Sequence, residues 1–216
     1  MKNYSLIVLL VLIQSCAVSK MEQLHNGDLL FVQAEQKNLS GAISRVTETN
    51  QLISFDHIAI IEKIDNKINV LEASIKNGSS KILYKKFIKN HNDTKVILYR
   101  LKPQFQYAIP EALLKANSML GKPYNISYIL DDNEYYCSDF IERSFRKAHI
   151  FELKPMTFKD PKTGKTDLFW KNFYNNLGIE VPEGKMGCNP NGLSQSSKID
   201  KITVLNNIRL LLFNEN

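Results

Sequence analysis

A pair of β-branched segments joined by a short turn constrains the fold of this chain more than any other feature. Residues 57–62 and 67–73 are rich in Ile and Val, which favour strands, and Asp65-Asn66 between them suits a tight turn. Two such segments with a two-residue loop form an antiparallel hairpin. The sequence therefore predicts a β-hairpin at this place, and a sheet built around it.

Other apolar patterns add strands and helices to this hairpin. Pro110 and Gly121 suit the start and the end of a helix, and apolar residues from Ile141 to Ala148 recur at helical spacing. The segment 151–198 contains several Pro and Gly and is expected to be mostly loop around one aromatic stretch. The expected elements are strands at residues 29–32 and 95–101, helices at residues 39–46, 110–121 and 138–148, and a final strand pair or short helix at residues 199–213. The predicted fold class is α+β, a small antiparallel β-sheet or barrel packed against helices.

The N-terminus has the pattern of an export signal. A short apolar run at residues 6–13 follows Lys2 and precedes Ser15-Cys16, and a run this short cannot cross a bilayer as a helix. The order resembles the lipobox of bacterial lipoproteins, in which the signal is cut before the cysteine and the thiol is acylated. An ordinary secretory signal with an incidental cysteine is the alternative. The predicted organisation is a signal peptide at residues 1–15, a tether lipidated on Cys16 at residues 16–24, and one domain at residues 25–216.

This pattern predicts an exported protein of the cell envelope, anchored by its lipid to a bacterial membrane. The formal net charge of +6 includes a cluster of Lys81, Lys85, Lys86 and Lys89, which we interpret as a solvated face. The sequence contains no zinc finger, RNP motif or recognition-helix pattern, so no nucleic-acid partner is expected. The sequence leaves open which membrane face carries the anchor, and whether the protein is an oligomer.

With Cys16 acylated, two cysteines remain in the mature chain, Cys137 and Cys188. They could form a disulfide in an oxidising compartment, or one could be a working thiol and the other a bystander. No pair of cysteines and histidines has the spacing of zinc ligands, so neither a metal site nor a cofactor is expected.

The register of the hairpin brings a histidine and a glutamate together. If the turn is symmetric about Asp65-Asn66, Ala59 lies opposite Glu72, and His57 shares a face with Glu72 as its diagonal neighbour. A carboxylate there could hold the imidazole in one tautomer. The alternative is two exposed strand residues unrelated to catalysis, and a three-residue turn would move Glu72 to the other face.

Cys137 is predicted to open the helix that begins near Ser138. A thiol at a helix N-terminus lies near the positive end of the helix dipole, which favours the thiolate, and the thiolate is the attacking species in covalent catalysis. The backbone N–H groups of this first turn could also stabilise an oxyanion. The alternative is a small buried hydrophobe at a helix start.

Five short strings in a fixed order resemble a known family. The strings are Gly27-Asp28-Leu29-Leu30-Phe31, Phe55-Asp56-His57-Ile58-Ala59-Ile60, Val70-Leu71-Glu72-Ala73, Gly121-Lys122-Pro123-Tyr124 and Tyr135-Tyr136-Cys137-Ser138-Asp139-Phe140. In this order they resemble the circularly permuted NlpC/P60 papain-like hydrolases, in particular the YiiX/YebB-like group, in which the histidine strand precedes the cysteine helix. The resemblance covers residues 25–150 and extends weakly to the segment around Cys188.

The resemblance implies a permuted papain-like fold and a role for each matching residue. Cys137 matches the nucleophile, His57 the base and Glu72 the residue that orients the base. Tyr124 matches a residue near the active-site entrance, and Tyr136 is expected to contact substrate with it. Cys188, His25, His91 and His149 match no catalytic position and are interpreted as surface or core residues, and Asp139 stands where the family would have Glu.

The function expected from these residues is that of a cysteine hydrolase. Cys137 would attack an amide, His57 would transfer the protons, and water would hydrolyse the thioester. The resemblance and the envelope location favour a cell-wall peptide as substrate. A lipid-directed amidase or acyltransferase with an acyl-lipid substrate is the alternative, and a non-catalytic envelope binding module is the alternative from another class.

Overall fold

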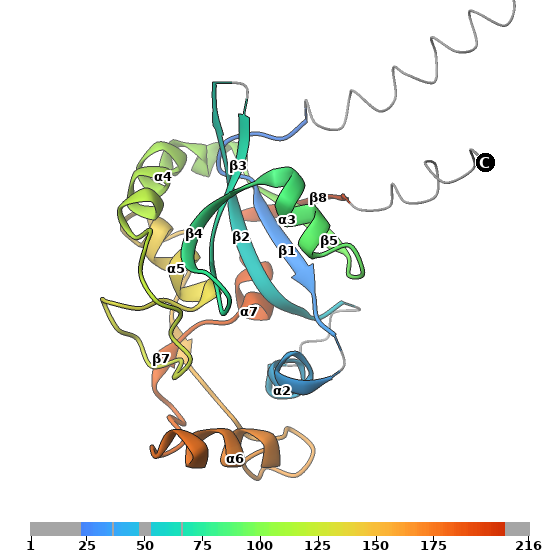
Figure 1. The fold of residues 1–216 in the computed structure, drawn as a ribbon, viewed down its shortest axis with the longest axis vertical. Helices are drawn as coiled ribbons and strands as arrows, with labels where there is room; N and C mark the ends of the chain where they lie inside the picture. Colours follow the sequence, from blue (N-terminus) through green and yellow to red (C-terminus); the bar gives the residue numbers. More distant parts are fainter. Residues whose placement is uncertain (1–22, 36, 48–52, 66, 206–216) are drawn as a thin grey trace, which may run out of the picture.

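The structure, a computed structural model, describes residues 23–35, 37–47, 53–65 and 67–205. Its centre is a six-stranded antiparallel sheet with the strand order β4-β3-β2-β1-β5-β8 (Figure 1). The strands of this sheet are β1 (Leu29–Gln33), β2 (Phe55–Ile64), β3 (Lys67–Ser74), β4 (Gly78–Leu83), β5 (Val96–Leu101) and β8 (Ile199–Val204). A second sheet pairs β6 (Lys154–Pro155) with β7 (Met186–Gly187). Cys16 and the predicted signal peptide lie outside the described residues.

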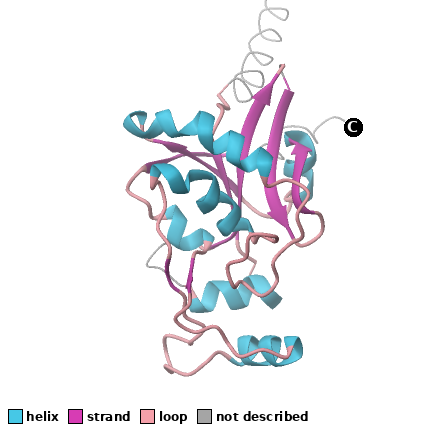
Figure 2. Cartoon of the chain, turned by 90° about the vertical axis from the view of Figure 1, so that its left-hand side faces the viewer, coloured by secondary structure: helices cyan, strands magenta, loops and turns pink. Residues whose placement is uncertain are grey.

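Helices flank the central sheet, most of them on one side of the strands (Figure 2). The helices are α2 (Asn38–Val46), α3 (Tyr84–Asn90), α4 (Ile109–Ser118), α5 (Cys137–Phe145), α6 (Leu168–Leu177) and α7 (Pro190–Ser194), with 3-10 turns η1 (Pro103–Ala108) and η2 (Arg146–Ala148). The mixture of helices with an antiparallel sheet confirms the predicted α+β class. No helix in the described part of the chain is both long and apolar enough to span a membrane.

The predicted hairpin forms the neighbouring strands β3 and β2 of this sheet. β2 and β3 pair from Ile60 opposite Leu71 to Ile64 opposite Lys67, which is the register expected for a turn centred on Asp65-Asn66. Asp65 has a φ of 46°, in the left-handed region that tight hairpin turns require and that Asp tolerates. The register therefore places Ala59 and Glu72 opposite one another, as predicted.

Each face of the sheet has its own core, because neighbouring side chains on a strand point to opposite faces. Leu29 and Phe31 belong to the larger cluster, which contains the apolar side chains of α4 and α5. Leu30 and Val32 belong to the other cluster, with Phe87 of α3. The sheet is therefore covered by α5 and α4 on one face and by α3 on the other.

Helices predicted at residues 39–46, 110–121 and 138–148 are confirmed as α2, α4, and α5 with η2. β4 and α3 were not predicted, because the strand is interrupted by Ser79, Ser80 and Lys81 and the helix is rich in lysine. At residues 199–213, β8 is a single strand paired with β5, and residues 206–213 lie outside the described part.

The segment predicted as mostly loop contains a ten-residue helix, α6, at one end of the molecule (Figure 1). The Asp167 carboxylate accepts a hydrogen bond from the Phe169 N–H and caps its start, and Gly178 ends it with a left-handed φ of 69°. Trp170 and Tyr174 pack with Ala42 of α2 in a third cluster. α6 therefore extends the fold beyond the edge of the sheet.

Candidate active site

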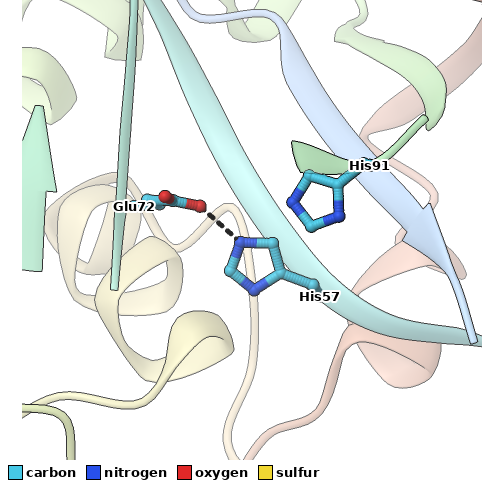
Figure 3. A group of neighbouring side chains, drawn as sticks. All are labelled: His57, Glu72 and His91. Atoms are coloured by element: carbon cyan, nitrogen blue, oxygen red, sulfur yellow. Dashed lines mark hydrogen bonds and ion pairs between the residues drawn. The ribbon is translucent and has the colours of Figure 1, made fainter. Parts of the chain in front are cut away.

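The side chains of His57 and Glu72 are joined by a short hydrogen bond across β2 and β3. Nε2 of His57 lies 2.7 Å from Oε2 of Glu72, and the two side chains are 14% and 4% exposed (Figure 3). With Nε2 bound to the carboxylate, Nδ1 is the ring nitrogen left for another partner. The diagonal pair expected from the register is therefore in contact, and the carboxylate fixes the orientation of the imidazole.

A β-bulge lies beside His57. Val32 of β1 pairs with His57 and Gln33 pairs with Phe55, so Asp56 is an extra residue on β2. Bulges bend a strand and redirect its side chains, and they are common next to active sites. The carbonyl oxygen of Asp56 lies 3.8 Å from Sγ of Cys137. The bulge thus turns the end of β2 toward the start of α5.

Cys137 is the first residue of α5, as predicted, and its side chain is buried. Its thiol lies beside His57, and because Glu72 holds Nε2, Nδ1 is the ring nitrogen left to face the thiol. Burial lowers the pKa of His57, but the Cys137 thiol and the Glu72 carboxylate together raise it well above its ordinary value. Contact with the thiol and the carboxylate therefore stabilises the protonated imidazole that forms when His57 accepts a proton.

The same contacts act on Glu72. Burial raises the pKa of its carboxyl, but the hydrogen bond and the charge of His57 outweigh burial and lower it. The Glu72 carboxylate of β3 is therefore hydrogen-bonded to His57 of β2, and the Cys137 thiol of α5 lies beside His57. All three residues predicted as catalytic are brought together.

Two tyrosines lie against Cys137. The Tyr124 hydroxyl lies near the backbone N–H of Cys137 and near the Tyr128 hydroxyl. Burial raises the pKa of both phenols above the ordinary value. Tyr124 was expected here, whereas Tyr128 was not, since it lies outside the strings that suggested the site.

Tyr124 is positioned by a close approach of two backbones. Gly78, at the start of β4, has a φ of 60°, and a Cβ at this position would lie 2.3 Å from the carbonyl oxygen of Lys122. Ser79 N–H donates to that same oxygen at 2.8 Å, and Tyr124 then pairs with Tyr135 just before α5. Glycine at position 78 thus allows the loop that carries Tyr124 to dock beside Cys137.

Tyr136 and Cys188 lie behind the candidate nucleophile. The backbone N–H of Cys188 donates to the Tyr136 hydroxyl at 3.3 Å, and Ser138 Oγ donates to the Cys188 carbonyl at 3.1 Å. Tyr136 is almost fully buried, although it contributes to the cleft wall. Cys137 and Cys188 are both free, and burial raises the pKa of the Cys188 thiol well above its ordinary value. The question of a disulfide between them is thus answered: neither is bonded.

A cleft of about 480 Å³ opens beside Cys137. One wall carries Tyr124 and Tyr128, and the others come from α2, α6, α7 and the chain around β6 and β7. Most of the lining area is apolar. Apolar and aromatic lining residues are Ile43, Val46, Tyr128, Ile150, Phe151, Met156, Phe158, Trp170 and Leu193, and charged ones are Asp56, Glu152, Lys154 and Lys198.

His91 lies on the far side of His57 from the cysteine helix. It follows the last turn of α3, and its ring stacks on the His57 ring with centroids 5.6 Å apart and planes inclined by 23° (Figure 3). Burial, together with the charge of His57, lowers its pKa to about 4. The sequence interpretation of His91 as an ordinary surface or core residue missed this contact, and no spacing in the sequence could have indicated it.

Comparisons with known proteins identify the fold and the family of the chain. No curated protein matches the chain. One solved structure, described as the metalloprotein yiiX from Escherichia coli O157:H7, is similar with a TM-score of 0.67 and 20% identity, over 85% of this chain and 98% of that one. At this identity the likeness shows the fold alone.

A family model described as permuted papain-like amidase enzyme, YaeF/YiiX, C92 family, matches residues 23–203. The chain therefore belongs to the YaeF/YiiX family of permuted papain-like amidases, and it is a cysteine amidase.

Proposed function

We propose that the amidase reaction uses Cys137 as nucleophile, His57 as acid and base, and Glu72 as the residue that orients His57. The observation that carries this proposal is the 2.7 Å bond between Glu72 and Nε2, because it leaves Nδ1 to the thiol at the start of α5. In a neutral histidine the two nitrogens have different roles, and a carboxylate on one of them fixes which nitrogen meets the nucleophile.

The steps follow from these contacts. The Cys137 proton passes to His57 Nδ1, and Sγ bonds to the amide carbonyl carbon. The C–N bond then breaks as Nδ1 gives its proton to the leaving amine, and a thioester remains on Sγ. Water next gives a proton to Nδ1 and bonds to the thioester carbon, after which the carboxylic acid leaves and the proton returns to sulfur.

The oxyanion would form beside the first turn of α5. N–H groups in the first turn of a helix have no intrahelical acceptor, so they can donate to the developing charge. The Cys137 N–H is one of these groups, and the Tyr124 hydroxyl lies near it. A substrate oxygen placed there would displace or share that hydroxyl, so Tyr124 is assigned to substrate binding, with Tyr128 as its partner.

The apolar cleft favours a substrate with an apolar acyl group over a short wall peptide. Trp170, Phe158 and Met156 line the cleft, and each methylene buried against such side chains contributes ~0.8 kcal/mol, or about fourfold in binding. A cell-wall peptide is polar and would leave this surface in contact with water. We therefore assign an N-acyl amide as the substrate class, with the wall peptide as the second candidate.

Chromogenic anilides with acetyl, octanoyl and dodecanoyl groups test this assignment, with purified peptidoglycan as a parallel substrate. The acyl assignment predicts that kcat/KM rises steeply with chain length and that peptidoglycan yields no soluble peptides. Release of peptides from peptidoglycan, with no dependence on acyl length, would replace it by the wall-peptide function. No turnover of either substrate would contradict both substrate assignments.

An envelope location is part of this proposal. Cys16 lies outside the described residues, and the lipobox-like order before it supports lipidation. An acyl amide of a membrane would be within reach of an enzyme held at the surface by a short tether. Labelling of the protein by a fatty-acid probe in cells, lost on Cys16→Ser, is the expected result, and unchanged labelling of that variant would contradict the anchor.

No step of this mechanism passes through a metal ion. The described residues that could hold one are His57, Glu72 and His91. A divalent cation bound there would act as a Lewis acid toward the imidazole and the carboxylate.

A further inference from the structure

Three potential metal ligands from three different elements converge on the face of the sheet opposite to α5. His57 comes from β2, Glu72 from β3, and His91 from the end of α3 (Figure 3). One ligand atom from each, an imidazole nitrogen or a carboxylate oxygen, lies within 4.8 Å of the other two. His57 and His91 are partly exposed and Glu72 is buried, so an ion could enter from solvent and reach a carboxylate inside.

The donor set and its size fit a zinc-class cation. Two imidazoles and one carboxylate are ligands that zinc prefers, with a fourth position left for water. A metal about 2.1 Å from each ligand holds tetrahedral ligand atoms roughly 3.4 Å apart. The ring stacking already places His91 over His57, so closure requires a shift of roughly 1 Å at the outermost ligand, within the range of side-chain rotation.

We infer that His57, Glu72 and His91 form a binding site for one zinc-class divalent cation, and that occupation of this site switches the amidase off. The site overlaps the hydrogen bond that orients the base, because His57 would bind the metal through Nε2, the atom now held by Glu72. Nε2 can therefore bind the metal or hydrogen-bond to Glu72, but it cannot do both at once.

The loss of activity follows from the atoms involved. The bond from Nε2 to the metal forms as the Nε2–H bond breaks and its proton leaves to solvent, while Nδ1 takes up one proton from solvent. His57 then stays neutral with its single proton on Nδ1, so it cannot accept the Cys137 proton there. Releasing the Nδ1 proton to a leaving amine would make an imidazolate, which is far less favourable than a neutral imidazole. The loss of turnover rests on the proposed function, whereas metal binding itself does not.

Metal binding is measured first, by titrating Zn²⁺ into the full chain, purified in detergent and freed of metal, against a chromophoric chelator. His91→Phe keeps an aromatic ring on His57 and removes the ligand nitrogen. His149→Asn is the matched control, since His149 is exposed and Asn accepts its left-handed φ of 51°. We expect one tight ion in the unchanged chain and in His149→Asn, and at least about 100-fold weaker binding in His91→Phe. Equal affinity in all three would overturn the inference.

Cys137 is the main competitor as a ligand, because thiolates bind zinc well. Cys137→Ala should keep one tight ion, and Co²⁺ bound to the unchanged chain should show no sulfur-to-metal charge-transfer band. Loss of the ion in this variant, or a strong charge-transfer band, would place the metal on the thiol and overturn the inference. Circular dichroism checks the fold of each variant, and His91→Gln replaces His91→Phe if the latter does not fold.

Turnover is measured second, on the best anilide substrate. Zn²⁺ should reduce turnover of the unchanged chain at least tenfold, and a chelator should restore it. The ratio of turnover without and with Zn²⁺ should fall toward one in His91→Phe but not in His149→Asn. Tight binding with no loss of turnover would overturn the switch. If instead Cys137→Ala keeps its turnover, the proposed function fails while the binding results still decide the metal site.

Discussion

The β2–β3 hairpin with α5 and the cleft wall formed by α2 and α6 are built in different ways. Between β2 and β3, His57 and Glu72 are 15 residues apart, and a two-residue turn sets their relation. In the cleft wall, Ala42 packs with Trp170, and Arg45 pairs with Asp167 at 2.9 Å across 122 residues. The chemistry of the enzyme thus depends on local register, whereas the shape that selects its substrate depends on long-range packing.

The largest effect is expected at the proposed nucleophile. Cys137→Ala removes the sulfur that we propose attacks the amide, so turnover should fall by at least about 10⁴-fold, as for other covalent nucleophiles. The melting temperature should change little, because a buried thiol is replaced by a methyl group of similar character. Anilide hydrolysis and a thermal melt check both parts. Cys188→Ala, the other buried thiol, should keep turnover within about threefold; a comparable loss there would show that the assignment of roles is wrong.

Glu72→Gln should have the next largest effect. The amide can still bond to Nε2, but it no longer fixes the tautomer or stabilises the charged imidazole, and similar changes cost about 10²- to 10⁴-fold in kcat. The measurement is kcat and KM on one substrate, and the loss is expected in kcat. An unchanged kcat would separate Glu72 from the reaction and leave it a structural role in the sheet.

A change in the cleft wall should affect one substrate and not another. Met156→Gln keeps the length of the side chain and places a polar amide in the apolar lining, so kcat/KM should fall about tenfold for the dodecanoyl anilide and stay constant for the acetyl anilide. Met186→Gln is the matched control, because Met186 lies in the paired strand β7, outside the cleft, and is 48% exposed. An equal loss of kcat/KM with both substrates would show that the cleft wall affects the reaction itself and not only the choice of substrate.

The smallest effect concerns stability. The pKa of His57 is raised, so its pairing contributes fully below its ordinary value of 6.5 and is lost as pH rises through the raised pKa. The pKa of Glu72 is lowered, so its pairing contributes fully above 4.5 and is lost as pH falls through the lowered pKa. His91, which also contacts this pair, has its pKa lowered to about 4 and becomes charged only at the acidic end.

The difference in unfolding free energy between the unchanged chain and Glu72→Gln should therefore be largest between about pH 4.5 and 6.5, and smaller on either side. Urea unfolding across this range measures it. A difference that does not vary with pH would mean that the two groups are not paired in solution.

The difference between the hairpin, which is set by local register, and the cleft wall, which is set by long-range packing, explains what the sequence could predict. The register of the hairpin and the start of α5 could be read directly, because the Asp65-Asn66 turn and the position of Cys137 are local signals. The start and the end of α6 were also marked, by Asp167 and Gly178, although the Pro and Gly around the helix led to a prediction of loop. His91 and Tyr128 could not be found, since only the folding of α3 and of the loop that precedes α5 brings them to the site.

The residues that line the cleft could not be predicted from the sequence for a similar reason. Its lining comes from α2, from the chain around β6 and β7, and from α6 and α7, and no periodicity relates these segments to one another. The family resemblance supplied the nucleophile and the base, but the apolar character of the cleft appears only when Phe158 and Trp170 pack beside α2. The substrate prediction therefore shifts from wall peptide to acyl amide, while the predicted catalytic residues stay the same.

The central claim, that Cys137 is activated by His57 and Glu72, is tested most directly by trapping the acyl-enzyme. The chain is mixed with an activated acyl ester, quenched in acid, and mapped by mass spectrometry, with Cys188 as an internal control in the same molecule. The account predicts one acyl group on Cys137, none on Cys188, and a much slower appearance in His57→Ala and Glu72→Gln. Acylation of both thiols at similar rates, or acylation of Cys137 that does not depend on His57, would contradict it.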